Sequence, residues 1–314
     1  MAYPNLHLEK LTMSNGLKIP TLGYGTYDIP PSAVKIALEA GYRHIDCAYF
    51  YGNEKEIGKY LEEGMRELGI DRKDIFITSK VWFTHLHPEM VRKSCEETLK
   101  NLRLDYLDLL LFHWPTAFKP SDSGFSIDGS ATKYQVDLVP LKETWGAMEK
   151  LVDNGLVKSI GLSNFNKRQI DEILKNCTIK PAVLQIEMHA NFPNSKLVEY
   201  AQSLGLIVTS YGPLGSPGIF PIKGNLIGQP WVKKIAENHG RTASQVLLRY
   251  LIQRGAVVIP KASSRERIIE NTRIFDFALT AEEMDTMDKS GTNERLFKLP
   301  GAESHPEYPF HDEY

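Results

Sequence analysis

Short apolar segments recur eight times along this chain, and longer segments separate them. Each run is apolar at consecutive positions, so a strand formed there would be buried on both faces. Strands covered on both faces are typical of a parallel sheet with helices packed against it. The runs are Thr21–Gly25, His44–Ala48, Ile75–Lys80, Leu107–His113, Lys158–Ser163, Val183–Glu187, Leu206–Ser210 and Val257–Pro260.

Two of the intervening segments show helical spacing. Apolar residues recur there three or four positions apart, which puts them on one helical face. They are Val91, Cys95, Leu99 and Leu102 in one segment and Leu141, Trp145, Met148 and Val152 in the other. Pro88 suits the first turn of one helix, and Gly155 suits the end of the other.

Eight strand–helix units in about 300 residues predict a closed (β/α)₈ TIM barrel, an α/β fold, with residues 1–314 forming one domain. The alternative is an open doubly wound sheet, which binds dinucleotides through a glycine fingerprint. That fingerprint is absent, because Asp28 stands where the third glycine after Gly23 and Gly25 belongs. The barrel is therefore favoured.

Three segments do not belong to the eight strand–helix units. Residues 8–19 contain Ser14-Asn15-Gly16, a hairpin turn signal, and predict an N-terminal β-hairpin that plugs one end of the barrel. Residues 116–139 and 212–230 predict long loops after the fourth and seventh strands, at the C-terminal face, where loops of this length usually carry function.

Charge and cysteine content exclude several classes of protein. The formal net charge of -2 offers no basic surface for nucleic acid or an anionic membrane. Cys47, Cys95 and Cys177 are few and widely spaced, which indicates free thiols in a reducing compartment and no zinc site. The N-terminus shows no signal peptide pattern, so we expect a cytoplasmic protein. We also expect it to act as a monomer and to hold no metal ion.

Polar residues stand at the end of nearly every predicted strand, which is where barrel enzymes place their chemistry. They are Asp46, Lys80, His113, Ser163, Asn164, Gln185, Glu187, Tyr211 and Lys261, with Tyr51 following Asp46 closely. Taken singly, each has a structural explanation, such as a loop cap or a satisfied core histidine. A buried Asp or Lys is rare unless paired, so the combination favours a functional site.

Asp46 and Lys80 end neighbouring strands, where they can form an ion pair. We expect this pair to hold an ammonium group beside Tyr51 and to lower the pKa of its phenol from about 10 toward neutrality. Tyr51 would then be a general acid, and His113 would donate a hydrogen bond to the same substrate oxygen.

These segments closely resemble the aldo-keto reductase superfamily, and the aldose and aldehyde reductase branch in particular. The motifs are Gly41-Tyr-Arg-His-Ile-Asp-Cys-Ala-Tyr-Phe-Tyr51, Ile77-Thr-Ser-Lys80, Leu111-Phe-His-Trp-Pro115, Gly161-Leu-Ser-Asn-Phe165 and Ile259-Pro-Lys-Ala-Ser-Ser-Arg-Glu-Arg267. The resemblance implies NADPH-dependent reduction of aldehydes and ketones to alcohols. It makes Asp46, Tyr51, Lys80 and His113 the catalytic residues, with Tyr51 as proton donor.

The resemblance also implies a set of NADPH contacts. Lys261 and Arg267 match residues that hold the 2′-phosphate, and Ser263 to Glu266 also fits a capping box that opens a helix. The full set is Thr26, Tyr27, Ser163, Asn164, Gln185, Tyr211, Leu214, Ser216, Lys261, Ser263, Ser264, Arg267, Glu270 and Asn271. The substrate pocket would be lined by Tyr27, Trp82, Trp114, Phe125, Phe220, Phe297 and Leu299, which suits small hydrophobic carbonyl substrates.

The chain departs from the family pattern near the cofactor. Tyr27-Asp28 replaces the usual Trp-Lys, and Gly218 replaces an aspartate, so the ion pair that closes the loop over the cofactor is lost. One hypothesis is an inverted ion pair between Asp28 and a loop cation such as Lys223, so that Asp28→Ala speeds NADP⁺ release. The other is a loop held by packing alone.

Two other functions stay open at this point. A hydroxysteroid or prostaglandin-type ketone reductase would share every catalytic residue. A non-catalytic, nucleotide-binding structural or regulatory subunit would not need the complete set of Asp46, Tyr51, Lys80 and His113.

Overall fold

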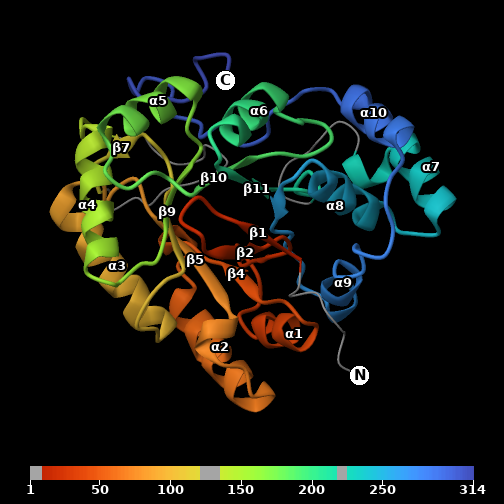
Figure 1. Ribbon diagram of the computed structural model, residues 1–314, viewed down its shortest axis with the longest axis horizontal. Coiled ribbons are helices and arrows are strands. Elements are labelled where there is room, and N and C mark those ends of the chain that lie inside the picture. Colours follow the sequence, from red (N-terminus) through yellow and green to blue (C-terminus); the bar gives the residue numbers. More distant parts are fainter. Residues whose placement is uncertain (1–8, 121–134, 218–224) are drawn as a thin grey trace.

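The computed structural model describes residues 9–120, 135–217 and 225–314. Parallel strands form a barrel, and helices surround it in the projection of Figure 1. The barrel strands are β3 (Tyr24–Gly25), β4 (His44–Asp46), β5 (Phe76–Val81), β6 (Leu109–Phe112), β9 (Ile160–Ser163), β10 (Val183–Glu187), β11 (Ile207–Tyr211) and β12 (Val257–Val258). This confirms the predicted (β/α)₈ barrel.

The first and last strands meet and close the barrel. Leu22 forms a parallel bridge with Val258, and the amide of Gly23 donates to the carbonyl of Val258 at 2.8 Å. Gly25 approaches the last strand closely, since a Cβ there would lie 2.9 Å from the Ile259 carbonyl oxygen. The glycine is therefore needed for closure.

The helices follow the strands in the predicted alternation. They are α1 (Ala33–Glu39), α2 (Glu54–Leu68), α3 (Pro88–Leu102), α4 (Leu141–Asp153), α5 (Lys167–Asn176), α6 (Ser195–Ser203), α7 (Pro230–His239), α8 (Ala243–Gln253), α9 (Arg265–Glu270) and α10 (Ala281–Ser290). Pro88 occupies the first turn of α3, and Gly155 follows α4 with a φ of 74°, as the sequence predicted. Helices α7 and α10 lie beside the ring in Figure 1 and are additions to the repeat.

The N-terminal hairpin closes one end of the barrel. Strands β1 (Lys10–Thr12) and β2 (Lys18–Pro20) pair antiparallel, with Leu11 opposite Ile19. Met13 and Ile19 are buried in one cluster with barrel-interior residues such as Leu111. The hairpin plug is confirmed from residue 9 onward, and Leu8 lies outside the described residues.

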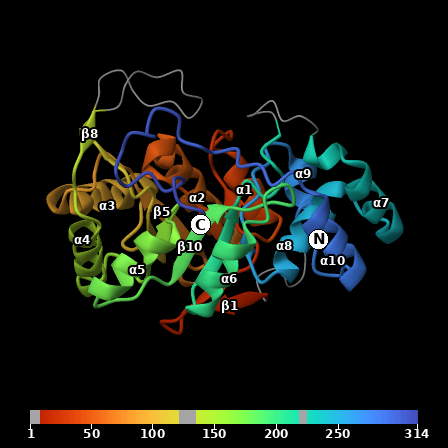
Figure 2. The same ribbon diagram turned by 90° about the horizontal axis from the view of Figure 1, so that it is seen from above.

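The opposite end carries the long connections. Figure 2 shows β1 at the bottom and β8 near the top, where the C-terminal segment also runs. In the described part of the loop predicted for 116–139, β7 (Ala117–Phe118) pairs with β8 (Val136–Asp137). After β11, a short 3₁₀ helix (Leu226–Gly228) leads into α7. Among the described residues, no helix combines the length and the apolar character needed to cross a bilayer.

Candidate active site

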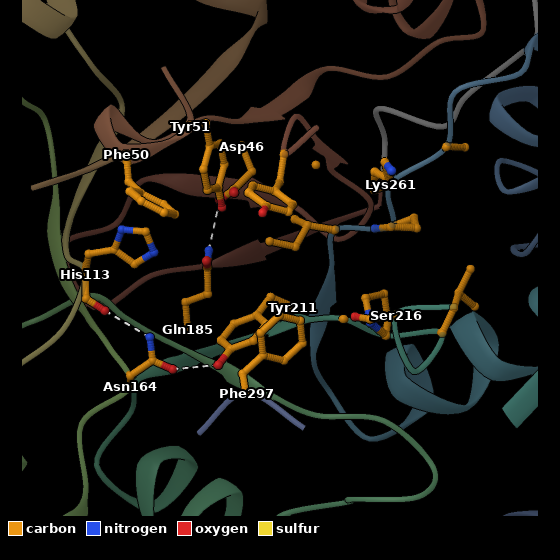
Figure 3. Close-up of a pocket in the computed structure, with 18 of the residues that line it drawn as sticks. Asp46, Phe50, Tyr51, His113, Asn164, Gln185, Tyr211, Ser216, Lys261 and Phe297 are labelled. Carbon is orange, nitrogen blue, oxygen red and sulfur yellow. Dashed lines mark hydrogen bonds between the residues drawn. The ribbon is translucent and has the colours of Figure 1, made fainter. Parts of the chain in front are cut away.

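The carboxyl ends of the barrel strands surround a cavity, as the sequence predicted. Strand pairing places Asp46 beside Thr78 and Gln185 beside Ser163, so polar residues from several strands reach the same level. Asp46, Tyr51, His113, Asn164 and Gln185 line the cavity, while Lys80 is buried directly behind Tyr51. Figure 3 shows Tyr51, Asp46 and His113 toward one side and Lys261 and Ser216 toward the other.

A buried ion pair lies under Tyr51. The Lys80 Nζ donates to Asp46 Oδ1 at 2.5 Å and to the Cys47 carbonyl at 2.7 Å, and it lies 3.3 Å from the Tyr51 hydroxyl. Burial alone would lower the pKa of Lys80, but Asp46 and Tyr51 together hold it above its ordinary value. Lys80 is therefore a fixed cation aimed at the phenol.

The pKa of Tyr51 differs from the sequence prediction. Burial raises the pKa of Tyr51 to about 12, and Asp46 adds to this effect. Lys80 acts in the predicted direction but does not overcome the loss of water around the phenol. The prediction of a lowered pKa was wrong for the protein alone, and Tyr51 carries its proton throughout the neutral pH range.

His113 stands next to Tyr51 in uncharged form. The two ring centroids are 6.3 Å apart. Burial, followed by the charge of Lys80, lowers the pKa of His113 well below its ordinary value. Its Nδ1 is buried without a hydrogen-bond partner in the part of the chain that the structure describes. A neutral imidazole at this position can offer one N–H to a bound oxygen.

Amide side chains form the floor of the cavity (Figure 3). Asn164, in the left-handed region at φ 61°, donates from Nδ2 to the His113 carbonyl at 2.9 Å. Its Oδ1 accepts from the Tyr211 hydroxyl at 2.7 Å. Gln185 Nε2 donates to Asp46 Oδ2 at 2.9 Å and so connects this floor to the buried ion pair.

Cations gather at the other end of the cavity. Lys261, Ser263 and Arg267 line it together with Leu214 and Ser216. The predicted capping box at Ser263 is wrong by one residue, because Ser264 caps α9 and its side chain accepts from the Arg267 amide. Arg267, not a glutamate, then occupies the third helical position.

Asp28 pairs with one of these cations. Its carboxylate lies 3.6 Å from Lys261 Nζ, and Asp28 is held in the left-handed region at φ 49°. The hypothetical partner Lys223 lies outside the described residues. Asp28 thus has a cation partner on the barrel side of the cavity.

Some predicted cofactor residues do not line the cavity. They are Thr26, Ser163, Ser264, Glu270 and Asn271. Thr26 is buried and donates to the Asp46 carbonyl at 2.8 Å, and Ser163 accepts from Asn164 at 3.2 Å. These two therefore support residues that do line the cavity. Glu270 accepts from Thr242 at 2.9 Å.

Aromatic and aliphatic side chains complete the cavity. Tyr27, Trp82, Trp114, Phe297 and Leu299 line it as predicted, whereas Phe125 and Phe220 lie outside the described residues. Phe50, which the sequence analysis missed, also lines it and stacks on Trp82 with ring centroids 4.0 Å apart. The sequence signal that could have found Phe50 is its position directly before Tyr51. The two residues share a 3₁₀ turn, Tyr49–Tyr51.

No grouping of three or more His, Cys, Asp or Glu suited to a metal ion occurs within residues 9–120, 135–217 and 225–314.

Comparison with known proteins agrees with this geometry. Residues 28–291 match the model of the aldo/keto reductase family. The chain is 44% identical to aldo-keto reductase family 1 member A1 of Xenopus tropicalis, over 98% of this chain and 99% of the relative. It is 45% identical to the protein of the same name from Gallus gallus, over 97% and 98% of the two chains.

A solved structure is similar over the whole barrel. The aldose reductase of Schistosoma japonicum superposes with a TM-score of 0.91 at 56% identity, covering 98% of this chain and all of that one. The barrel, the polar strand ends and these matches agree: the chain belongs to the aldo/keto reductase family.

Proposed function

We propose that Tyr51 is the proton donor in the reduction of aldehydes and ketones by NADPH, the reaction that family membership indicates. The observation that carries this assignment is the position of Lys80, whose ammonium touches both Asp46 and the Tyr51 hydroxyl at the edge of the cavity. A structural subunit would have no need to bury such a charge pair, whose net contribution to stability is small.

Tyr51 and His113 act together on the substrate oxygen. Tyr51 holds its proton at neutral pH and releases it to the oxygen as negative charge develops there. Lys80 stabilises the phenolate that remains, because its charge is fixed beside the hydroxyl by Asp46. His113 donates a hydrogen bond that orients the carbonyl. When bound, the reduced nicotinamide supplies the hydride that the carbonyl carbon accepts.

The residues present suit NADP(H). Lys261 and Arg267 offer two cations for the 2′-phosphate at one end of the cavity, with the hydroxyl of Ser263 between them in sequence. Asn164 and Gln185 offer amide groups for the carboxamide at the other end, and the Tyr211 ring offers a face for the nicotinamide. Preference for NADP(H) over NAD(H) follows from the two cations.

The lining of the cavity indicates the substrate class. Trp82, Trp114, Phe50, Phe297 and Leu299 surround the polar group formed by Tyr51 and His113. Apolar walls with few polar groups favour small hydrophobic or aromatic carbonyl compounds. The monomeric state and the cytoplasmic location stay predictions from the sequence. Sedimentation tests the first, and cell fractionation tests the second.

Replacement of the phenol tests the assignment directly. Tyr51→Phe removes the transferable proton and keeps the ring, so kcat for an aromatic aldehyde should fall about 10²- to 10⁴-fold. NADPH binding, followed by quenching of tryptophan fluorescence, should stay within about twofold, since the lost hydroxyl is assigned to the substrate and not to the cofactor. A kcat of Tyr51→Phe close to that of the natural protein would assign the proton to another group.

A further inference from the structure

A buried carboxylate at the end of β10 has no part in the chemistry above. Glu187 is the last residue of that strand, two positions beyond Gln185, and is 0% exposed. Burying an ionised carboxylate is costly unless hydrogen bonds replace the lost water. Its partners therefore indicate what the residue is for.

Those partners belong mainly to the C-terminal segment. Glu187 Oε1 accepts from the Leu296 amide at 2.7 Å, and Oε2 accepts from the Phe297 amide at 2.9 Å. His189 Nε2 lies 2.9 Å from Oε1 and completes the set. Each carboxylate oxygen thus binds one of two consecutive backbone N–H groups, more than a hundred residues away in sequence.

The bound segment continues directly into the cavity. The Phe297 ring meets the Tyr211 ring edge-on, with centroids 5.2 Å apart and planes at 85°. Leu299 also lines the cavity and is held in the left-handed region at φ 50°. A non-glycine residue in that region indicates a backbone that its surroundings hold in place.

Other contacts hold the C-terminal segment just before Leu296 and just after Phe297. The amide of Glu294 donates to the Asn191 carbonyl at 3.1 Å, and the Tyr308 hydroxyl donates to the Lys298 carbonyl at 2.5 Å. Arg295 stacks over the Phe192 and Phe310 rings at 4.5 and 3.8 Å. Residues 294, 295 and 298 do not line the cavity, whereas Phe297, whose amide donates to Glu187, does.

We propose that Glu187 is a positioning residue that fixes Leu296–Leu299 as one side of the substrate cavity and thereby sets its preference for aromatic over small aliphatic carbonyl compounds. This inference rests on the proposed function, since it concerns substrates of the same site. A large substrate uses the Phe297 and Leu299 surfaces, whereas a three-carbon aldehyde needs only Tyr51 and His113.

Glu187→Gln tests the proposal, because an amide keeps the shape but replaces one acceptor oxygen with an NH2 group that faces one of the two backbone N–H donors. At saturating NADPH, the kcat/KM of benzaldehyde relative to propanal should fall about tenfold, mainly through KM, which corresponds to one lost charge-assisted hydrogen bond. Amide hydrogen exchange of residues 296 and 297 should accelerate about tenfold or more.

Glu149→Ala is the control for a general loss of carboxylate–backbone contacts, because a glutamine oxygen at this position could still accept from both donors. Glu149, in α4, also uses a carboxylate oxygen to accept from two consecutive amides, those of Thr178 at 2.6 Å and Ile179 at 2.7 Å. Those residues do not line the cavity, so the ratio of the two aldehydes should not change. Equal shifts in both variants, or equal loss with both aldehydes, would show a general loss of stability and overturn the proposal.

Phe297→Ala covers the case in which Glu187→Gln does not fold. It leaves the carboxylate contacts to the backbone intact and removes the ring, so the aldehyde ratio should fall as well; an unchanged ratio refutes the proposal. Hydrogen exchange needs no turnover. If the natural protein reduces no carbonyl compound, the proposed function fails, while slow exchange at 296 and 297 in the natural protein and fast exchange in Glu187→Gln still show the backbone contact.

Discussion

A single residue changes the charge at the end of the cavity that is proposed to hold the cofactor phosphate. Asp28 brings a negative charge to within 3.6 Å of Lys261, one of the two cations proposed for the 2′-phosphate. Its side chain is 78% exposed, so water and salt weaken the pair. We therefore expect Asp28 to compete with the phosphate for Lys261, and only modestly.

Asp28→Asn removes this competition and keeps the size of the side chain. We expect NADPH to bind about two- to fivefold more tightly at low ionic strength, with NADH unchanged. Fluorescence titration at two salt concentrations measures both, and the difference should shrink at high salt. Weaker NADPH binding with faster release would instead support the hypothesis that Asp28 closes the loop over the cofactor.

The sequence predicted which residues form the site but not the direction of the Tyr51 pKa shift. Asp46, Tyr51, Lys80 and His113 could be grouped because each lies at the end of a predicted strand or shortly after it, and the structure brings them together. The direction of the Tyr51 pKa could not, because it depends on how completely water is excluded, which strand periodicity does not reveal.

At the scale of elements, the agreement between predicted and observed strands differs from one run to the next. Strand β10 was predicted residue by residue, whereas β12 ends at Val258, two residues short of the predicted Pro260. Proline has no N–H to donate to a neighbouring strand, so the ladder stops before it. The helix cap at Ser264 was missed by one position because both neighbouring serines suit a cap.

Helix packing makes one glycine essential. A Cβ on Gly58 of α2 would lie 2.3 Å from the Asn101 carbonyl oxygen at the end of α3. Gly58→Ala should therefore destabilise the protein by about 1–3 kcal/mol, since backbone must move. Gly146→Ala in α4 is the control, because a Cβ there meets nothing within 4 Å. It should stabilise by about 0.5–1 kcal/mol. Urea unfolding compares the two, and equal effects would contradict the packing argument.

At the scale of the whole molecule, buried histidines connect folding to pH. Burial lowers the pKa of His44 to about 4 and that of His113 well below its ordinary value. Between pH 6.5 and the folded pKa values, the unfolded chain binds these two protons and the folded protein does not. Acid therefore favours unfolding, and the loss begins as the pH falls below about 6.5.

From pH 6.5 to 5, His44 should cost about 2 kcal/mol of unfolding free energy, and His113 adds to the loss in the same direction. Urea unfolding at pH 7.5, 6.5 and 5 measures the loss, and the loss should be smaller in His44→Phe. Stability independent of pH would refute the histidine argument.

We propose that residues 1–314 form one domain, so circular dichroism and tryptophan fluorescence should report a single shared transition. Two separate transitions would refute the one-domain proposal.

The bridge between Leu22 and Val258 has a consequence for synthesis. A ribosome releases the N-terminal strand long before the one that pairs with it, so the growing chain carries an incomplete, open sheet with a bare edge on β3. Unpaired edges invite association with other chains. The edge of β3 therefore stays open to such association until Val257 and Val258 have left the ribosome and paired with the first strand.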